Sequence, residues 1–359
     1  MRLKRIFSKQ MVLLIVAVIL AFGLVGCGGT KSTNTEGKKA SNDAGKDEGS
    51  SSALKPFRVG CGDASKNTLN DLAAVAQKNG YLEEELNKVG YTLQVTGFQG
   101  QGPEINAALM RGSLDAGNYA ELPALTSKAS GADTTVVALS DRQLKYGILT
   151  GSNDIKTVQD LEGKKIIVQQ GTVIQYVWEQ IVKETGINAD KIEIINSNPV
   201  DGISLIQTGD ADALVSSANS LESYVKKGVG HLVEGVPDSA YSLTLFNISN
   251  AFLKKAPEVA VAVNKALLRT YDDVVADPQI LYDTLGERYG DGGAEIIKST
   301  YTVNDSLEYL YPEFDDSFNS YIHTLYDWMK ANSLLASEVD VDTYFDSSYF
   351  QKALEELGK

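Results

Sequence analysis

The stretch ALMRGSLDAGNYAELPAL (residues 108–125) places a short extended segment, SLDAGN, between two helical segments. We predict a helix over 103–112, a strand at SLDAGN and a helix from about Leu122 to Ser130. Strands that alternate with helices are typical of α/β proteins with mostly parallel sheets. The stretch therefore predicts one repeating unit of an α/β fold.

The same alternation continues on both sides of this stretch. Further strands are predicted at 57–61, 91–98 and 134–140, with helical sequence over 67–89. A second series follows, with strands at 164–170, 191–196, 211–217 and 231–236 and helices at 172–185, 200–207 and 219–226. Two β-rich segments, 145–150 and 242–249, bracket this series, and helices dominate from Leu253 onward.

This order predicts an α/β fold of two Rossmann-like lobes joined by two crossover segments. We expect lobe 1 to comprise 56–146 and 244–359, including the C-terminal helices, and lobe 2 to comprise 147–243. Residues 56–359 are long enough for two lobes, each with its own core.

The first 27 residues have the layout of a secretory signal peptide. Four basic residues lie within the first nine positions, and an uncharged apolar run follows from Met11 to Val25. The run is about 16 residues through Gly26, shorter than the roughly 20 that a membrane-spanning helix needs. Its end, LVGC (24–27), resembles a bacterial lipobox, which implies that Cys27 is acylated and that the preceding peptide is removed. The alternative is a cysteine buried in a membrane helix.

The segment from 28 to 55 contains only three Ala and one Leu as apolar residues, so it cannot form a core. A coil of this length has a root-mean-square span of about 30 Å. We predict a disordered tether that links a lipid anchor on the extracytoplasmic face of the cell membrane to the folded domain.

Charge and cysteine content narrow the function classes. Residues 56–359 carry 24 Lys and Arg against 43 Asp and Glu, and most of the excess lies in 272–359. Nucleic-acid binding is disfavoured, because there is no basic patch to neutralise phosphates. Cys61 has no partner for an intramolecular disulfide once Cys27 is acylated, and it ends the apolar run FRVGC. We therefore predict a small buried strand residue rather than a nucleophile.

Four stretches carry a family resemblance in register. The stretch 108–125 is similar to the ALxxGxxDxGxxGDxPxL region of the aliphatic-sulfonate, taurine and nitrate/bicarbonate solute-binding proteins of ABC importers, an NMT1/THI5-like family. The other three are DLEGKKIIVQQGT (160–172), LIQTGDADALV (205–215) and NAFLKKAPEVAVAVNKALLRTYDDVVADP (250–278), and YIHTLYDWMKANSLL (321–335) looks like the family's late helix. The resemblance implies the type II periplasmic binding protein fold, with a cleft that closes on one small solute.

The resemblance also implies partners: an ABC permease and its ATPase, a small-molecule solute, and the membrane through the lipid anchor. It implies a monomer without a cofactor or a metal. An enzyme is the first alternative, because the superfamily resembles proteins that make or carry the pyrimidine precursor of thiamine. His231 and His323 lie far apart in the pattern, and no HxxxH or cysteine cluster could hold a metal. An adhesion lipoprotein with an exposed aromatic tail is the second alternative, although the spacing of Phe314, Phe318, Tyr321, Leu325 and Trp328 predicts a core-facing stripe on lobe 1.

Ligands of α/β sheets bind beyond the carboxyl ends of strands, where helix starts offer free N–H groups to an oxyanion. QQGTVIQYV shows this most clearly, with Gly171 and Thr172 at a predicted helix start. An ordinary strand-to-helix turn with Thr172 as the cap is the alternative. The other predicted ligand-binding residues are Asp63, Ser65, Gln99, Gln101, Asn118, Tyr119, Gln143, Ser217 and Asn219.

Glu121 is also a predicted site residue, and two roles are open for it. It could pair with the ammonium group of a zwitterion such as taurine, or it could satisfy N–H groups at a helix start. Arg142 and Lys145 are the only candidate cations at the matched positions. The expected solute is therefore a small organic oxyanion, an alkanesulfonate or a taurine-like sulfonate, with nitrate, bicarbonate or a thiamine pyrimidine as alternatives.

Overall fold

The computed structural model describes residues 53–62, 66–302 and 306–359. The signal peptide, Cys27, nearly all of the tether and the predicted site residues Asp63 and Ser65 lie outside the described residues. In the part of the chain that is described, no helix combines the length and the apolar character needed to cross a membrane.

Lobe 1 is built on three parallel strands in the order β2-β1-β3. They are β1 (Lys55–Cys61), β2 (Tyr91–Gly97) and β3 (Ala116–Ala120). Helices α1 (Asp71–Lys78), α2 (Tyr81–Lys88) and α3 (Gln101–Met110) connect them, and α4 (Glu121–Ala129) follows β3. The prediction of one helical stretch over 67–89 is wrong, because Gly80 takes a φ of 81° that ends one helix before the next begins.

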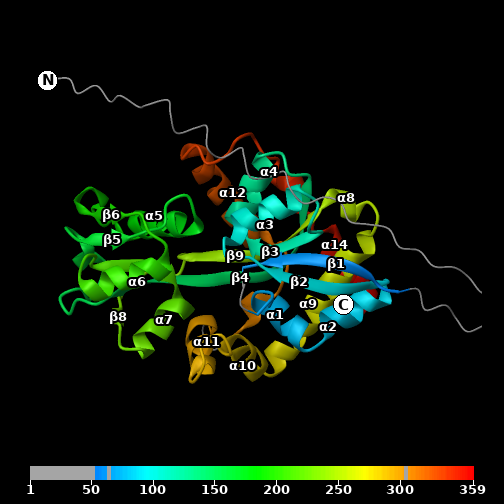
Figure 1. Cartoon of the computed structure of the whole chain (residues 1–359), viewed down its shortest axis with the longest axis horizontal. Coiled ribbons are helices and arrows are strands. Elements are labelled where there is room, and N and C mark those ends of the chain that lie inside the picture. Colours follow the sequence, from blue (N-terminus) through cyan, green and yellow to red (C-terminus); the bar gives the residue numbers. More distant parts are fainter. Residues whose placement is uncertain (1–52, 63–65, 303–305) are drawn as a thin grey trace, which may run out of the picture. The chain divides into compact units, whose positions relative to one another are not determined.

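Two long antiparallel strands connect the lobes: β4 (Thr134–Thr150) and β9 (Tyr241–Ser249). The predicted strand at 134–140 and the predicted connector at 145–150 are one continuous strand of 17 residues. Its first part, to Lys145, pairs with β9, and its last part, from Tyr146, pairs with β7. Figure 1 shows the β4–β9 pair running from the strands of lobe 1 to those of lobe 2.

Lobe 2 contains β5 (Lys165–Ile167), β6 (Glu193–Ile195), β7 (Ala213–Ser217) and the short β8 (His231–Leu232). Strand β5 runs parallel to both β6 and β7. The intervening elements are the 3₁₀ turns η1 (Val158–Leu161) and η2 (Ala189–Lys191) and the helices α5 (Val173–Thr185), α6 (Pro199–Thr208) and α7 (Ala218–Lys226). The sheet order is β2-β1-β3-β9-β4-β7-β5-β6, with β8 on β4, which confirms the predicted α/β fold. The lobe boundaries near 146 and 243 stay a prediction.

Helices dominate after β9, as predicted. They are α8 (Asn250–Leu253), α9 (Pro257–Ala276), α10 (Gln279–Gly286), α11 (Gly293–Tyr301), η3 (Glu308–Leu310), α12 (Asp316–Ala331), α13 (Val341–Tyr344) and α14 (Ser348–Leu357). The buried side chains Phe318, Tyr321 and Leu325 of α12 share a hydrophobic core with residues of α3 and α4. This packing confirms the predicted stripe on lobe 1 for these three positions.

A second core lies between the lobe 1 strands and helices α1, α2, α9 and α10. Phe57, Val59 and Cys61 alternate along β1 and are all fully buried in it. The prediction that Cys61 is a buried strand residue is confirmed.

Candidate functional site

In each lobe, the carboxyl ends of the parallel strands lie at one edge of the sheet. In lobe 1, β2 leads into α3 and β3 leads directly into α4. In lobe 2, β5, β6 and β7 lead into α5, α6 and α7. Helix starts are therefore gathered at these edges, where the sequence places the predicted site residues.

The start of α5 is closed by its own side chains. Thr172 is the N-cap, and its Oγ1 accepts from the N–H of Ile174 at 3.2 Å and donates to the Gln169 carbonyl at 2.7 Å. The Gly171 N–H donates to Gln175 Oε1 at 2.8 Å, and Gly171 has a φ of 71°. The predicted cap geometry is confirmed, whereas contact of Gly171 and Thr172 with a ligand stays a prediction.

Asn118 lies fully buried in the middle of β3. Its Oδ1 accepts from the Asn70 N–H at 2.8 Å, and its Nδ2 donates to Ser140 Oγ at 2.9 Å. The Asn118 carbonyl accepts from Asn70 Nδ2 at 3.0 Å. Asn118 thus joins β3 to the start of α1 and to β4, and a ligand would have to displace one of these bonds to reach its amide.

Tyr119 is also buried, and its neighbours satisfy its hydroxyl. The hydroxyl donates to Asn106 Oδ1 and accepts from Asn247 Nδ2, both at 2.8 Å. These bonds tie β3 to α3 and to β9. Ligand contact by Tyr119 stays a prediction.

Glu121, the first residue of α4, is fully buried. Its Oε1 accepts from the Tyr321 hydroxyl of α12 at 2.7 Å, and its Oε2 accepts from the Leu243 N–H of β9 at 3.1 Å. Burial raises the pKa of Glu121 to about 7, although these donors and its own backbone N–H act in the opposite direction. Of its two possible roles, the geometry matches the carboxylate that satisfies backbone N–H groups.

Gln143 lies within β4 rather than at a strand end, and its N–H donates to Asp141 Oδ1 at 2.8 Å. Gln99 is exposed between β2 and α3, and Gln101 is exposed at the first position of α3. At the start of α7, Ser217 Oγ donates to Ser220 Oγ at 2.9 Å, and Asn219 Oδ1 accepts from the Ser220 N–H at 2.8 Å.

The two candidate cations are held by lobe-surface acceptors. Arg142 donates to Asp315 at 2.5 Å and to Ser317 Oγ at 2.8 Å. Lys145 donates to the Asp238 carbonyl at 2.9 Å. Neither side chain therefore offers an uncommitted positive charge to an anion.

Aromatic side chains from both lobes meet beside α12, which was not predicted. Tyr241 of β9 stacks on Tyr321 at 4.9 Å, and Tyr176 of α5 packs edge-on against Trp328 at 5.1 Å. Trp328 Nε1 donates to Glu179 Oε2 of α5 at 2.6 Å. The predicted stripe of α12 therefore ends at a residue that binds lobe 2 rather than lobe 1.

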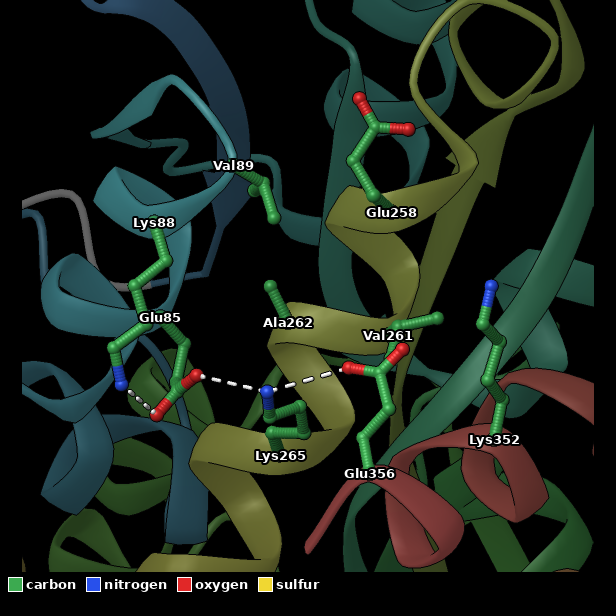
Figure 2. Close-up of a pocket in the computed structure, with 9 residues that line it drawn as sticks. All are labelled: Glu85, Lys88, Val89, Glu258, Val261, Ala262, Lys265, Lys352 and Glu356. Carbon is green, nitrogen blue, oxygen red and sulfur yellow. Dashed lines mark hydrogen bonds and ion pairs between the residues drawn. The ribbon is translucent and has the colours of Figure 1, made fainter.

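A pocket of about 90 Å³ lies between α2, α9 and α14. Figure 2 shows Lys265 between two carboxylates, Glu85 at 3.5 Å and Glu356 at 3.3 Å. Lys88 pairs with Glu85 at 2.8 Å. No predicted site residue lines this pocket, and ion pairs join four of its charged residues, so it is not the candidate site.

The two histidines have separate partners. The His231 ring bonds to the Ile155 carbonyl at 2.8 Å, and the His323 ring lies 3.0 Å from Asp342. Among the described residues, no group of three or more His, Cys, Asp or Glu side chains could hold a metal ion.

The arrangement of two β/α lobes joined by β4 and β9 is that of type II periplasmic binding proteins. A family model described as "NMT1/THI5 like" matches residues 72–280, more than half of the chain. The chain belongs to the NMT1/THI5-like family.

Two curated relatives come from Escherichia coli (strain K12). The "Putative aliphatic sulfonates-binding protein" is 29% identical over 114 residues, 31% of this chain and 36% of the relative. The "Taurine-binding periplasmic protein" is 26% identical over 215 residues, 58% of this chain and 64% of the relative. The chain matches less than two thirds of the length of either relative.

Solved structures share the fold. A periplasmic sulfonate-binding protein from Methylobacillus flagellatus KT superposes with a TM-score of 0.71 at 23% identity, over 85% of this chain and 96% of that one. A desulfurization enzyme also superposes, with a TM-score of 0.64 at 14% identity over 84% and 99% of the two chains. The fold therefore occurs in both binding proteins and enzymes.

The raised pKa of Glu121 predicts a specific pH dependence of stability. Its pKa lies near 7 in the folded state, above the unfolded value of 4.5. The folded state thus favours the protonated form, and a contribution on the order of 3 kcal/mol is present below about pH 4.5 and is lost as pH rises through 7. Glu121→Gln, which does not titrate, should show a smaller loss of Tm than the unaltered protein between about pH 5 and about pH 8.

Thermal unfolding at both pH values measures this difference. Glu355→Gln, at an exposed position of α14, is the matched control and should keep the original slope. An unchanged slope in Glu121→Gln would contradict the assignment of a raised pKa to Glu121.

Proposed function

We propose that this protein is the extracytoplasmic solute-binding component of an ABC importer and that it captures a small organic sulfonate. The observation that carries the proposal is that both curated relatives are named for sulfonate ligands, one for aliphatic sulfonates and one for taurine. The solute would be delivered to a permease that works with an ATPase. The protein would act as a monomer and without chemistry on the solute.

The start of α5 supplies the chemistry for a sulfonate oxygen. Backbone N–H groups and the positive end of the helix dipole favour an oxyanion there. The Gln175 side chain now accepts from the Gly171 N–H and lies exposed enough to be displaced by a ligand oxygen. Charge-assisted hydrogen bonds contribute roughly 1.5–3 kcal/mol each, so three or four could supply the roughly 8 kcal/mol of a micromolar complex.

Closure of the lobes would bring lobe 1 against this helix start. Strands β4 and β9 are the connecting segments, and the pairing of β4 changes partner from β9 to β7 between Lys145 and Tyr146. We place the hinge at Tyr146 on β4 and near Leu245 on β9, with lobe boundaries at 146 and 243. Hinge closure about such connectors is the usual way in which two-lobed binding proteins enclose a solute.

The first prediction for this function concerns α5. Thr172→Ala removes the N-cap hydroxyl and should weaken sulfonate binding by about tenfold, since about 1.4 kcal/mol corresponds to one decade in Kd. Gly171→Val should be worse, because Gly171 has a φ of 71° that a β-branched residue rarely adopts. Calorimetric titration with taurine and alkanesulfonates measures both effects.

Thr185→Ala is the matched control, because Thr185 donates to the Ile181 carbonyl at the other end of the same helix. It should leave the affinity unchanged. If both substitutions at the start of α5 leave the affinity within about twofold, the sulfonate does not bind at this helix. Binding of nitrate, bicarbonate or a thiamine pyrimidine in place of every sulfonate would contradict the proposed solute class.

The second prediction concerns the membrane anchor. Cys27 ends the lipobox-like LVGC and would carry the acyl chains that hold the protein to the membrane surface. Cys27→Ser should leave the precursor uncleaved and should abolish incorporation of labelled palmitate in the expressing cells. Labelling of the Cys27→Ser protein would show that the anchor lies elsewhere.

A further inference from the structure

Two carboxylates that were not predicted as site residues lie buried beside the crossing strands. Asp71, the first residue of α1, is 7% exposed, and Asp141, in the middle of β4, is fully buried. The Oδ2 atom of each side chain has no hydrogen-bond partner. Buried carboxylate oxygens are normally satisfied, so both atoms call for an explanation.

Both carboxylates belong to residues whose backbone departs from regular geometry. Asp141 pairs with Thr244 of β9 at a point where the β4–β9 register shifts on both sides, and such bulges re-aim a side chain. Asp71 has a φ of 57°, a conformation that is uncommon for residues other than glycine and that concentrates at functional sites. The Tyr301 hydroxyl of α11 donates to Asp71 Oδ1 at 2.6 Å.

A third unsatisfied oxygen lies on the same face of the strand pair. Ser242 is 1% exposed, and its Oγ has no partner. Ser242 stands two residues before Thr244 on β9, so both side chains project from one face of the sheet. Three buried oxygen acceptors without donors thus come from this one region.

This region also borders lobe 2. Burial raises the pKa of Tyr289, Arg288 and a hydrogen bond to Ser220 lower it, and the charge of Asp71 raises it further. Ser220 belongs to the start of α7, next to the predicted site residues Ser217 and Asn219. A tyrosine whose pKa responds to Asp71 thus also bonds to the start of α7 in lobe 2.

The ionised form of each carboxylate is disfavoured by the other. Burial raises the pKa of both, and the charge of Asp71 raises that of Asp141 further. The Tyr301 hydroxyl, the Thr244 side chain and Arg288 lower the pKa of Asp71 but do not offset its burial. Tyr146, Tyr289, Tyr301 and Tyr309 are the other titratable groups that respond to this pair, and burial keeps their hydroxyls protonated. Burial and mutual repulsion therefore disfavour the doubly charged form of this pair when no cation is bound.

We propose that Asp71 and Asp141, with Ser242, form a subsite for a cationic nitrogen, so that the protein selects aminoalkanesulfonates over simple alkanesulfonates. The inference rests on the proposed function, because it assigns the second end of the same solute. An ammonium group offers three donors, which match the three unsatisfied oxygens. Its positive charge would also offset the negative charge that burial and mutual repulsion disfavour in this pair.

Glu121 is not available for this role. Both of its oxygens already accept hydrogen bonds, from Tyr321 and from Leu243. The sequence pattern pointed to Glu121 because of its position in the family motif. The structure instead places unsatisfied acceptors at Asp71 and Asp141, which no local motif marks.

Taurine and ethanesulfonate test the proposal, because they differ only in the amino group. Calorimetric titration of the purified protein should show taurine binding at least about tenfold more tightly than ethanesulfonate. Asp141→Asn and Asp71→Asn should each reduce this ratio to near one by weakening taurine alone. Asp327→Asn, an exposed position on α12, is the control and should preserve the ratio.

A second measurement needs no variant. Titration of taurine in buffers of different ionisation enthalpy should reveal proton release in the pH range where the pair titrates, whereas ethanesulfonate should release none. Taurine affinity should accordingly fall as pH falls, because protons compete with the ammonium group.

The outcomes separate the two proposals. Equal affinities for taurine and ethanesulfonate, without proton release, would overturn the cationic subsite and leave the sulfonate function standing. Failure of both ligands and of longer alkanesulfonates to bind would overturn the proposed function itself. Selectivity that survives Asp71→Asn and Asp141→Asn would place the ammonium group at other residues and would also overturn the subsite.

Discussion

The antiparallel ladder between β4 and β9 is the element on which the rest of the structure depends. It is the only pairing among the described residues that reaches both sets of parallel strands, since β9 also pairs with β3 and β4 also pairs with β7. A ladder of this kind bends and twists more readily at a bulge than in its regular parts. The register shifts around Asp141 lie on the same strand as Tyr146, where we propose the hinge.

A buried carboxylate lies beside each face of this ladder, and each accepts a hydrogen bond from a tyrosine hydroxyl of a C-terminal helix. Glu121 is bonded by Tyr321 of α12, and Asp71 is bonded by Tyr301 of α11. The same two regions contact lobe 2, where Trp328 donates to Glu179 and Lys226 donates to the Gly292 carbonyl at 2.6 Å. The C-terminal region thus contacts both buried acids and also contacts lobe 2.

Local sequence patterns predicted the helices and strands better than they predicted which residues contact each other. Alternating strands and helices gave the α/β fold, the two connecting segments and the buried position of Cys61. The 134–150 strand was divided because the polar residues Asp141, Arg142 and Gln143 interrupt its apolar pattern, although β9 pairs with it on both sides of them. The Glu121–Tyr321 bond spans 200 residues, and the Asp71–Tyr301 bond spans 230. Sequence periodicity gives no information on contacts between residues so far apart. The hydrogen bonds of Glu121 and the proximity of Asp71 to Asp141 therefore could not be predicted from the sequence.

Closure of two lobes about the β4–β9 ladder is the central claim, and small-angle scattering tests it most directly. The radius of gyration would be measured for the folded protein with and without a sulfonate at saturating concentration, with circular dichroism as a check on secondary structure. We expect a smaller radius with ligand and an unchanged dichroism spectrum. An unchanged radius, with calorimetry confirming that the ligand is bound, would contradict lobe closure and would indicate a rigid pocket.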